Sequence, residues 1–98
     1  MAVVTLRYWA AAKDAAGIAE ETITAETLAE ALAAARGKTE HSEHAGQAGR
    51  ADRHARLRAV LARSSFLING APVGSRAPEA VVLSDSAVIE VLPPFAGG

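Results

Sequence analysis

Large apolar side chains are scarce in this chain, and their scarcity limits the hydrophobic core that it can build. Half of the 98 residues are hydrophobic by type, but 24 of these 49 are Ala, which leaves 25 larger apolar side chains. A chain of this length buries only about 60–65% of the surface that it exposes when unfolded. We therefore expect one small domain with a thin core.

The first large apolar residues alternate along residues 3–9, VVTLRYW. Successive side chains of a strand point to opposite faces, so Val4, Leu6 and Tyr8 share one face and Trp9 belongs to the other. β-Branched and aromatic residues favour strands. The segment is predicted to be a strand with one buried face, and Trp9 is predicted to be at least partly exposed.

The next segments favour helices and a second strand. Residues 10–16, AAAKDAA, are strong helix formers, and Gly17 suits a left-handed cap at their end. Residues 18–23 alternate weakly and could pair with the first strand. Thr24 is then available as the N-cap of a helix over about 25–36, which we expect to be the principal helix.

A polar segment follows. Residues 37–54 contain no large apolar residue and three Gly, so we expect an exposed loop there. Asp52 can cap a further helix with an apolar stripe at Leu57 and Leu61. The arginines of this helix are interpreted as a solvated face, with an anion or nucleic-acid site as the alternative; they are Arg53, Arg56, Arg58 and Arg63.

The last third indicates more strands. Asn69-Gly70 tolerates the positive φ angles of a tight hairpin turn, which would lead into Pro72-Val73. Apolar runs at 80–83 and 87–92 complete the pattern. This mixed order predicts an α+β domain over residues 1–92, with a sheet packed on one principal helix.

Charge and cysteine content exclude several functions. Ten Lys and Arg against 11 Asp and Glu give a net charge of −1, which does not favour nucleic acid as the main partner. Without Cys, the chain has no disulfide, thiol nucleophile or Cys-ligated cluster. No apolar run is long enough for a membrane span, and we expect a soluble, cytoplasmic protein.

The chain ends LPPFAGG, which predicts a flexible tail over residues 93–98. Pro93 and Pro94 cannot donate ladder hydrogen bonds, so Leu92 should be the last sheet residue. Gly97 and Gly98 make the end slim enough to enter a narrow channel. A frayed terminus is the alternative interpretation.

An α-carboxylate such as that of Gly98 is ionised at neutral pH and is a poor electrophile. Conversion to a mixed anhydride with AMP would supply a leaving group, after which a sulfur donor or an amine could attack the carbonyl carbon. The domain would then be a carrier and not a catalyst.

Several motifs together resemble the MoaD/ThiS family of ubiquitin-like sulfur carriers. The motifs are the opening VTLRYWAAAKDAAG, the helix near Thr24, the LING turn, the Ser-Asp turn before the last strand, and LPPFAGG. The resemblance is closest to small subunits of molybdopterin synthases. The 37–54 loop departs from the family pattern, which is usually shorter there.

The resemblance implies a β-grasp fold and a sulfur carrier that is not an enzyme on its own. A ubiquitin-activating-like enzyme would consume ATP to adenylate Gly98, which would then receive sulfur as a thiocarboxylate. The tail, which includes Ala96, would enter the large subunit of the synthase, in an expected heterotetramer. There, sulfur would pass to a pterin precursor to form the dithiolene that holds molybdenum. No stably bound cofactor is implied.

The same fold predicts a docking surface. The first and last strands of a β-grasp sheet run parallel and adjacent, which would bring Trp9 and Leu92 into one apolar patch. Pro72 or Val73 could extend this patch, and Phe95 could anchor the tail in a partner pocket. In the alternative interpretation, Trp9 covers the edge of its own domain.

Other candidate sites are weaker. His41 and His44 have an i, i+3 spacing, and His54 lies nearby, but we interpret all three as solvated and expect no metal site. The serines lack a nucleophile-elbow motif or a partnered His.

Two alternatives to a molybdopterin synthase subunit stay open. The first is delivery of sulfur to another product, such as thiamine thiazole, cysteine or tRNA. The Pro-Pro and the length argue against the thiamine branch by resemblance. The second is a ubiquitin-like modifier joined through Gly98, or an interaction module that is never activated.

Overall fold

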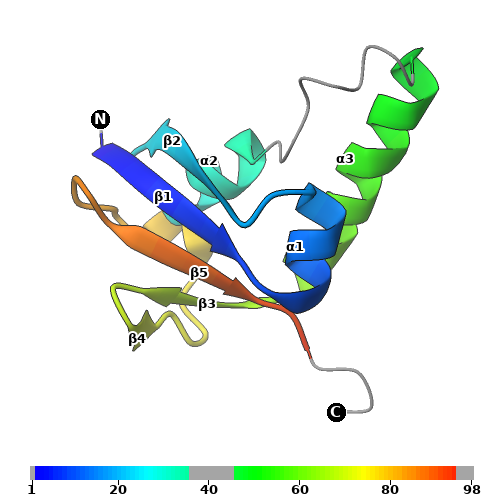
Figure 1. The fold of residues 1–98 in the computed structure, drawn as a ribbon. Helices are drawn as coiled ribbons and strands as arrows, with labels where there is room; N and C mark the ends of the chain where they lie inside the picture. Colours follow the sequence, from blue (N-terminus) through cyan, green and yellow to red (C-terminus); the bar gives the residue numbers. More distant parts are fainter. Residues whose placement is uncertain (1, 36–45, 95–98) are drawn as a thin grey trace.

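The computed structural model describes residues 2–35 and 46–94, with side chains described from residue 55 onward in the second range. Its elements, shown in Figure 1, are β1 (Ala2–Tyr8), α1 (Ala10–Ala16), β2 (Glu20–Ala25), α2 (Leu28–Ala34), α3 (Gly46–Arg63), β3 (Ser65–Ile68), β4 (Ala71–Pro72), the 3-10 helix η2 (Pro78–Ala80) and β5 (Val88–Leu92).

The strands form one mixed sheet of five in the order β2-β1-β5-β3-β4. The first and last strands, β1 and β5, run parallel at its centre, with Tyr8 opposite Val91. The other neighbouring pairs are antiparallel. This arrangement is the predicted α+β, β-grasp sheet.

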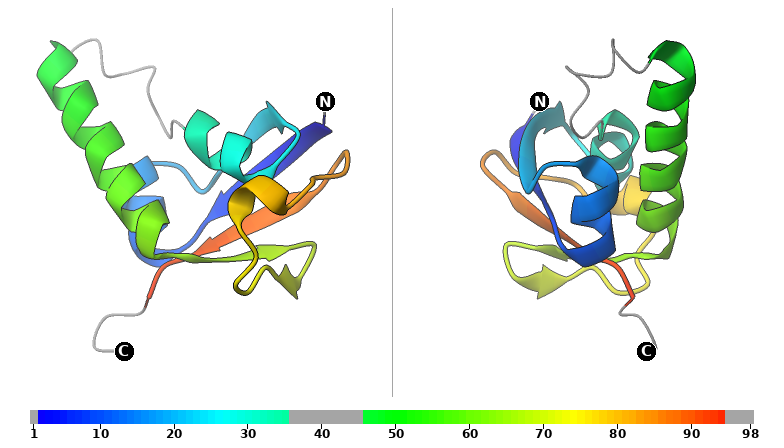
Figure 2. Two further views of the ribbon diagram at one scale, coloured as in Figure 1. Left: turned by 180° about the vertical axis from the view of Figure 1, so that it is seen from behind. Right: turned by 45° about the vertical axis from the view of Figure 1, so that its right-hand side comes forward.

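The sheet has a covered face and an open face. Seen from behind, α2, η2 and α3 lie over the covered face (Figure 2), whereas no described helix lies over the face turned to the viewer in Figure 1. The buried core lies between the sheet and these helices. Its largest fully buried side chains are Tyr8, Leu6, Leu28, Leu57, Ile89, Val4 and Val91.

Two local predictions are confirmed by backbone geometry. Gly17 ends α1 with φ 76°, and its N–H donates to the carbonyl of Lys13. Asn69 and Gly70 have φ 51° and 86°, the two positive angles of a type I′ hairpin turn between β3 and β4. In both places, the left-handed conformation favours the residue that the sequence provides.

The predicted cap of the principal helix is wrong. Thr24 lies in β2, which extends to Ala25, and Thr27 is the N-cap of α2. The Thr27 hydroxyl accepts from the N–H of Glu30 at 3.2 Å, while the Glu30 carboxylate accepts from the N–H of Glu26 at 2.8 Å. The T-x-x-E spacing of a capping box is visible in the sequence and identifies this start.

The region predicted as a loop over 37–54 is helical from residue 46. Helix α3 begins at Gly46, before the predicted cap at Asp52, and contains 18 residues. Its Leu57 and Leu61 are buried as predicted. The sheet therefore packs against α3 as well as α2, so more than one helix supplies the core.

The apolar run over residues 80–83 does not form a strand. Residues 78–80 form η2, and Val82 makes only an isolated bridge to Thr27. Val81 and Leu83 are buried, but Val82 is 79% exposed. The alternation of a strand is present there, but no described strand lies beside it to form a ladder.

Within the described ranges, no helix is both long and apolar enough to cross a membrane.

Candidate functional site at the carboxyl end of the sheet

The parallel pairing of β1 and β5 brings two predicted site residues together. Tyr8 of β1 lies opposite Val91 of β5. The residues that follow them, Trp9 and Leu92, therefore lie at the same end of the sheet. Both belong to the open face by alternation, because Tyr8 and Val91 are buried on the other. The sequence prediction of this juxtaposition agrees with the strand register.

Trp9 is an exposed aromatic side chain at this end of the sheet. It occupies the N-cap position of α1 in extended conformation and is 42% exposed. The guanidinium carbon of Arg7, two residues earlier on the same face, lies 5.3 Å from the centre of its ring. A cation–π contact at an exposed site is worth about 0.5–1 kcal/mol. Arg7 therefore holds the ring over the open face.

Leu92 is the last strand residue, as predicted, and it is half-buried opposite Ser65 of β3. The predicted tail does not leave the domain at once, because Pro93 is still buried and Pro94 is the first exposed residue. Pro93 continues the inward alternation of Ile89 and Val91. Pro93 is therefore packed with the domain, and exposure begins at Pro94.

The remaining tail residues that the sequence singles out lie outside the described part of the chain. They are Phe95, Ala96, Gly97 and Gly98.

Pro72 lies on the same open face, whereas Val73, the other candidate for extending the patch, is buried in the core. Pro72 is exposed in β4 and pairs with Leu67, which in turn lies opposite Glu90 of β5. Half-buried Leu67 thus separates Pro72 from the central strands. We call Trp9, Leu92, Leu67 and Pro72 the open-face patch.

Sequence reasoning missed two members of this surface. Leu67 extends the open-face patch, and the register assigns it to the face of Pro72. Arg7 is the neighbour of the Trp9 ring. The alternation in the first strand puts Arg7 and Trp9 on one face, so that contact could have been inferred, whereas the face of Leu67 depends on pairing with β4 and β5.

Tyr8 is the polar group of the covered face next to this site. Its side chain is 2% exposed, and its hydroxyl donates to the carboxylate of Glu21 in β2. Burial first, and then the hydrogen bond and negative charge of Glu21, raise the pKa of Tyr8 well above its usual value. The phenol stays protonated at neutral pH and acts as a fixed hydrogen-bond donor.

The histidines proposed as alternative ligands are not placed by the structure. His41 and His44 lie outside the described residues, and the side chain of His54 is likewise not described. Among the side chains that are described, no three His, Cys, Asp or Glu residues gather as metal ligands would.

Solved structures with the same fold cover nearly the whole chain. Small archaeal modifier protein 1 from Methanosarcina acetivorans is 23% identical, with a TM-score of 0.68, over 100% of this chain and 98% of that one. A putative molybdopterin converting factor subunit 1 from Pyrococcus furiosus is 19% identical, with a TM-score of 0.63, over 97% and 100%.

A third neighbour comes from a complex of subunits 1 and 2 of the molybdopterin-converting factor from Helicobacter pylori. It is 22% identical, with a TM-score of 0.62, over 98% of this chain and 99% of that one. Likenesses at these identities establish the β-grasp fold. No curated protein matches the sequence.

The family is established by a sequence model. The model of the ThiS family matches residues 6–98, which include the end of β1, the LING turn, the open-face patch and the tail through Gly98. With the sheet order and the strand register in agreement, this chain belongs to the ThiS family, the ubiquitin-like sulfur carriers that its motifs resemble.

Proposed function

We propose that this protein is the small, sulfur-donating subunit of a molybdopterin synthase and that Gly98 carries the sulfur. The observation that carries the proposal is the family match through residue 98, on a sheet whose last strand ends beside an exposed apolar patch. The carrier itself supplies a carboxyl group and a docking surface, and the chemistry of activation belongs to its partners.

The proposed cycle has three steps. The Gly98 carboxylate attacks the α-phosphate of ATP on an activating enzyme, which forms an acyl adenylate and releases pyrophosphate. A hydrosulfide equivalent from a sulfur donor then attacks the carbonyl carbon, and AMP leaves. The resulting thiocarboxylate delivers its sulfur to a pterin precursor, and water restores the carboxylate oxygen. A dithiolene needs two sulfur atoms, so two loaded carriers serve each product.

The open-face patch is the proposed docking surface for the large subunit and the activating enzyme. Trp9 is 42% exposed, Leu92 and Leu67 are half-buried, and Pro72 is exposed. Apolar surface of this kind next to a reactive segment is typical of a protein contact. Phe95 would add an anchor from the tail itself.

The similar structures include proteins named for this branch of the family and also supply one competitor. Two of them are named as subunit 1 of a molybdopterin converting factor, one in complex with subunit 2. Another is named as a small archaeal modifier protein. A ubiquitin-like modifier, joined through the same Gly98 to lysine side chains, is therefore the second candidate.

Mass spectrometry of the protein purified from its own host separates the two candidates. A carrier shows a species in which one oxygen of the C-terminal peptide is replaced by sulfur. A modifier shows conjugates to lysines of other proteins. The same spectrum shows whether Gly98 is the final residue. Detection of conjugates without any thiocarboxylate would contradict the sulfur-carrier proposal.

Reconstitution tests the pathway. Thiocarboxylated protein is mixed with a candidate large subunit and the cyclic pterin precursor, and dithiolene product is measured. Deletion of Gly98 or addition of one residue after it should abolish transfer, because the reacting carbon is lost or displaced. Unmodified protein is the control. Transfer by the extended chain would refute the role of Gly98.

Trp9→Ala tests the docking surface. The variant should bind the large subunit at least about tenfold more weakly, because an aromatic anchor is lost at the contact. Val82→Ala is a matched control, since Val82 is also exposed but lies away from the open-face patch. Equal affinity of wild type and Trp9→Ala, measured by calorimetry, would remove Trp9 from the interface.

A further inference from the structure

Strand β2 is an edge of the sheet with unpaired backbone groups. It has β1 on one side and no described strand on the other, since the order is β2-β1-β5-β3-β4. The hydrogen bond from the N–H of Tyr8 to the carbonyl of Ala19, at 2.8 Å, sets the phase of the ladder. Alternate residues of an antiparallel pair exchange bonds, so Glu21, Ile23 and Ala25 face β1.

The intervening residues direct their backbone groups away from the sheet. The N–H and carbonyl groups of Glu20, Thr22 and Thr24 point to the free side of β2, and no hydrogen bond to another described residue takes them up. The bonds of β1 to β5 agree with this phase, because Thr5 donates to Ala87 at 2.9 Å on the opposite side. These three alternate residues offer backbone donors and acceptors with which one added strand could pair.

The other edge of the sheet is not equivalent. Strand β4 has only two residues, and one of them is Pro72, which has no N–H to donate. Short strands and proline protect edges against pairing. Strand β2, with six residues, β-branched Thr22, Ile23 and Thr24, and no proline, lacks both protections.

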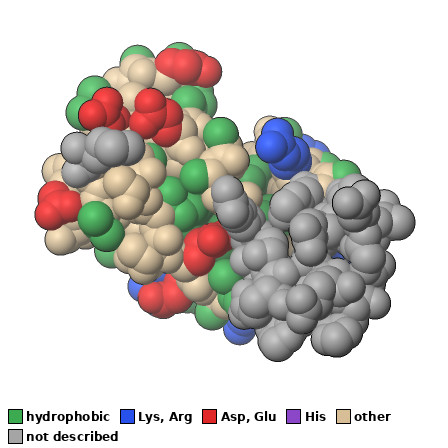
Figure 3. Space-filling model, turned by 90° about the horizontal axis from the view of Figure 1, so that it is seen from above, with side chains coloured by type: hydrophobic (Ala, Val, Ile, Leu, Met, Phe, Trp, Pro, Cys, Tyr) green, Lys and Arg blue, Asp and Glu red, His purple; other side chains and the backbone are tan. Residues whose placement is uncertain are grey.

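The surroundings of the β2 edge are acidic. Residues 20–35, from the start of β2 through α2, contain four Glu and no Lys or Arg; they are Glu20, Glu21, Glu26 and Glu30. Seen from above in Figure 3, acidic side chains gather on the half of the molecule that holds the N-terminal end of β1, where Lys and Arg are sparse. The Arg7–Glu20 pair, at 4.0 Å and largely exposed, neutralises this charge only weakly.

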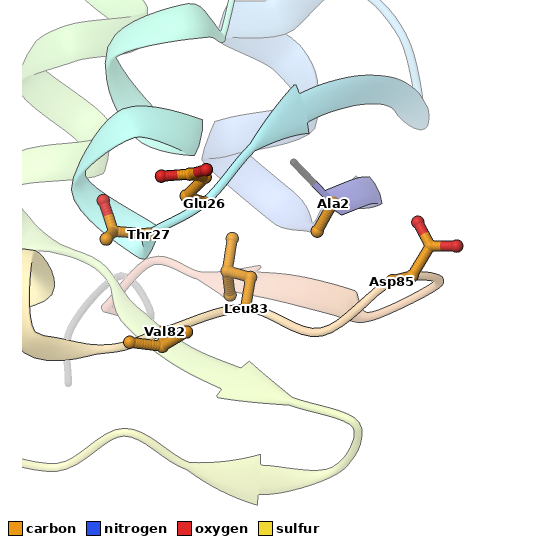
Figure 4. Close-up of a pocket in the computed structure, with 6 residues that line it drawn as sticks. All are labelled: Ala2, Glu26, Thr27, Val82, Leu83 and Asp85. Carbon is orange, nitrogen blue, oxygen red and sulfur yellow. The ribbon is translucent and has the colours of Figure 1, made fainter.

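A hollow of about 400 Å³ lies where β2 ends, and it extends the acidic surface. Figure 4 shows the carboxylates of Glu26 and Asp85 on two sides of it, with Leu83 between them and Val82 turned outward. One oxygen of Asp85 accepts from the N–H of Val3 at 2.9 Å, which fixes this carboxylate at the rim. The hollow combines apolar lining with negative charge.

We propose that the β2 edge binds an extended, lysine- or arginine-bearing segment of a partner protein as an added strand. Backbone groups of Glu20, Thr22 and Thr24 would supply the pairing, and the acidic side chains would select a basic partner. The proposal does not depend on sulfur transfer, because the β2 edge contains none of the residues of the open-face patch.

A second copy of this chain fits the edge less well. Antiparallel pairing of two β2 strands through their outward residues would place Glu20 opposite Thr24, and it would offer the acidic side chains of either copy no cation from residues 20–35. The complementary charge therefore points to a basic segment as the occupant.

The direct test is amide hydrogen exchange by NMR with a defined peptide. The probe is an acetylated and amidated heptapeptide of alternating Lys and Val. In the free protein, the amides of Thr22 and Thr24 should exchange rapidly while those of Glu21 and Ile23 are protected. Saturating peptide should slow Thr22 and Thr24 at least about tenfold, because each N–H gains an acceptor.

Two control peptides separate strand pairing from charge attraction. A heptapeptide with Glu in place of Lys should not bind. The Lys-Val peptide with its internal nitrogens methylated keeps the charge but cannot donate, and it should bind at least about tenfold more weakly. Equal binding of the methylated peptide would overturn the proposal.

Thr22→Pro and Thr22→Val form a matched pair of variants. Thr22→Pro removes the outward N–H without touching the ladder to β1 and should weaken binding at least about tenfold. Thr22→Val keeps the N–H and should bind like wild type. Thr24→Lys provides a second variant that adds a repelling charge, should the proline variant fail to fold.

Three further outcomes would refute the proposal. One is peptide-induced shifts that map to Trp9 and the open-face patch instead of β2. Another is wild-type affinity in both Thr22→Pro and Thr24→Lys. The third is a dimer, by sedimentation, in which Thr22 and Thr24 are already protected without peptide.

Discussion

The two faces of β1 show how one strand serves two purposes. On the covered face, Val4, Leu6 and Tyr8 are at most 2% exposed, whereas Val3 and Trp9 on the open face are 49% and 42% exposed. Both faces carry apolar side chains, so hydrophobicity alone does not separate them. The described helices cover only one face, so the apolar side chains of the other are exposed among the residues that the structure describes.

This contrast assigns different consequences to substitutions one residue apart. Changes on the covered face should lower the free energy of unfolding, because packing cannot readjust around a deleted side chain. Changes on the open face should leave stability nearly unchanged and alter binding instead.

Leu6→Ala should cost about 2–5 kcal/mol of stability, since Leu6 is 0% exposed at the centre of the core. Val3→Ala, on the open face of the same strand, should change stability by no more than about 0.5 kcal/mol. Urea unfolding measures both. Equal losses in the two variants would show that the open face is covered in solution.

Tyr8→Phe should cost about 1–2 kcal/mol, because the Glu21 carboxylate loses a partly buried donor. The variant should also change the pH dependence. The folded state raises the pKa of Tyr8 above its unfolded value, so the stabilisation is complete below about pH 10 and is lost progressively at higher pH.

The pH test uses the fact that Tyr8 is the only tyrosine. Wild type should lose stability above about pH 10 with a slope of up to about 1.4 kcal/mol per pH unit, and Tyr8→Phe should lack this contribution. Ultraviolet absorbance of tyrosinate follows the same group directly. A normal tyrosine titration in the folded protein would contradict the buried hydrogen bond.

Arg7→Gln should change stability by less than about 1 kcal/mol, because its ion pair with Glu20 and its contact with Trp9 are both exposed. The fluorescence of Trp9, the only tryptophan, should nevertheless shift as the cation leaves its ring. Arg7→Lys keeps a cation and is the matched control. An unchanged emission spectrum in Arg7→Gln would show that the contact does not persist in solution.

Local features were predictable where a short segment determines its own conformation. The alternation of Val4, Leu6 and Tyr8 identified the buried face of β1, and Asn69-Gly70 identified the hairpin. The T-x-x-E spacing from Thr27 to Glu30 identifies the start of α2, whereas Thr24, the predicted cap, lies in β2. Each feature depends on dihedral preferences or side-chain period within a few residues.

Helix α3 shows where such reasoning ends. Its first turns contain Ala, Gln and Arg but no large apolar residue, so no hydrophobic period indicates a helix there. The buried Leu57 and Leu61 anchor its other half, and the helix extends to Gly46 through Ala, Gln and Arg, which have good helix propensity, although Gly49 is also present. The loop is predicted because residues 37–54 lack large apolar side chains. That criterion does not account for a helix that propagates from its buried half into a polar segment.

The class of the domain, the inward and outward faces of β1, the hairpin turn and the motifs of the ThiS family follow from local geometry and residue identity, so the sequence predicts them. Three other features emerge from the folded sheet: Leu67 joins the open-face patch, Pro93 is buried, and the backbone groups of Thr22 and Thr24 point away from β1. These facts depend on strand order and register, which arise from pairing between residues far apart in the chain.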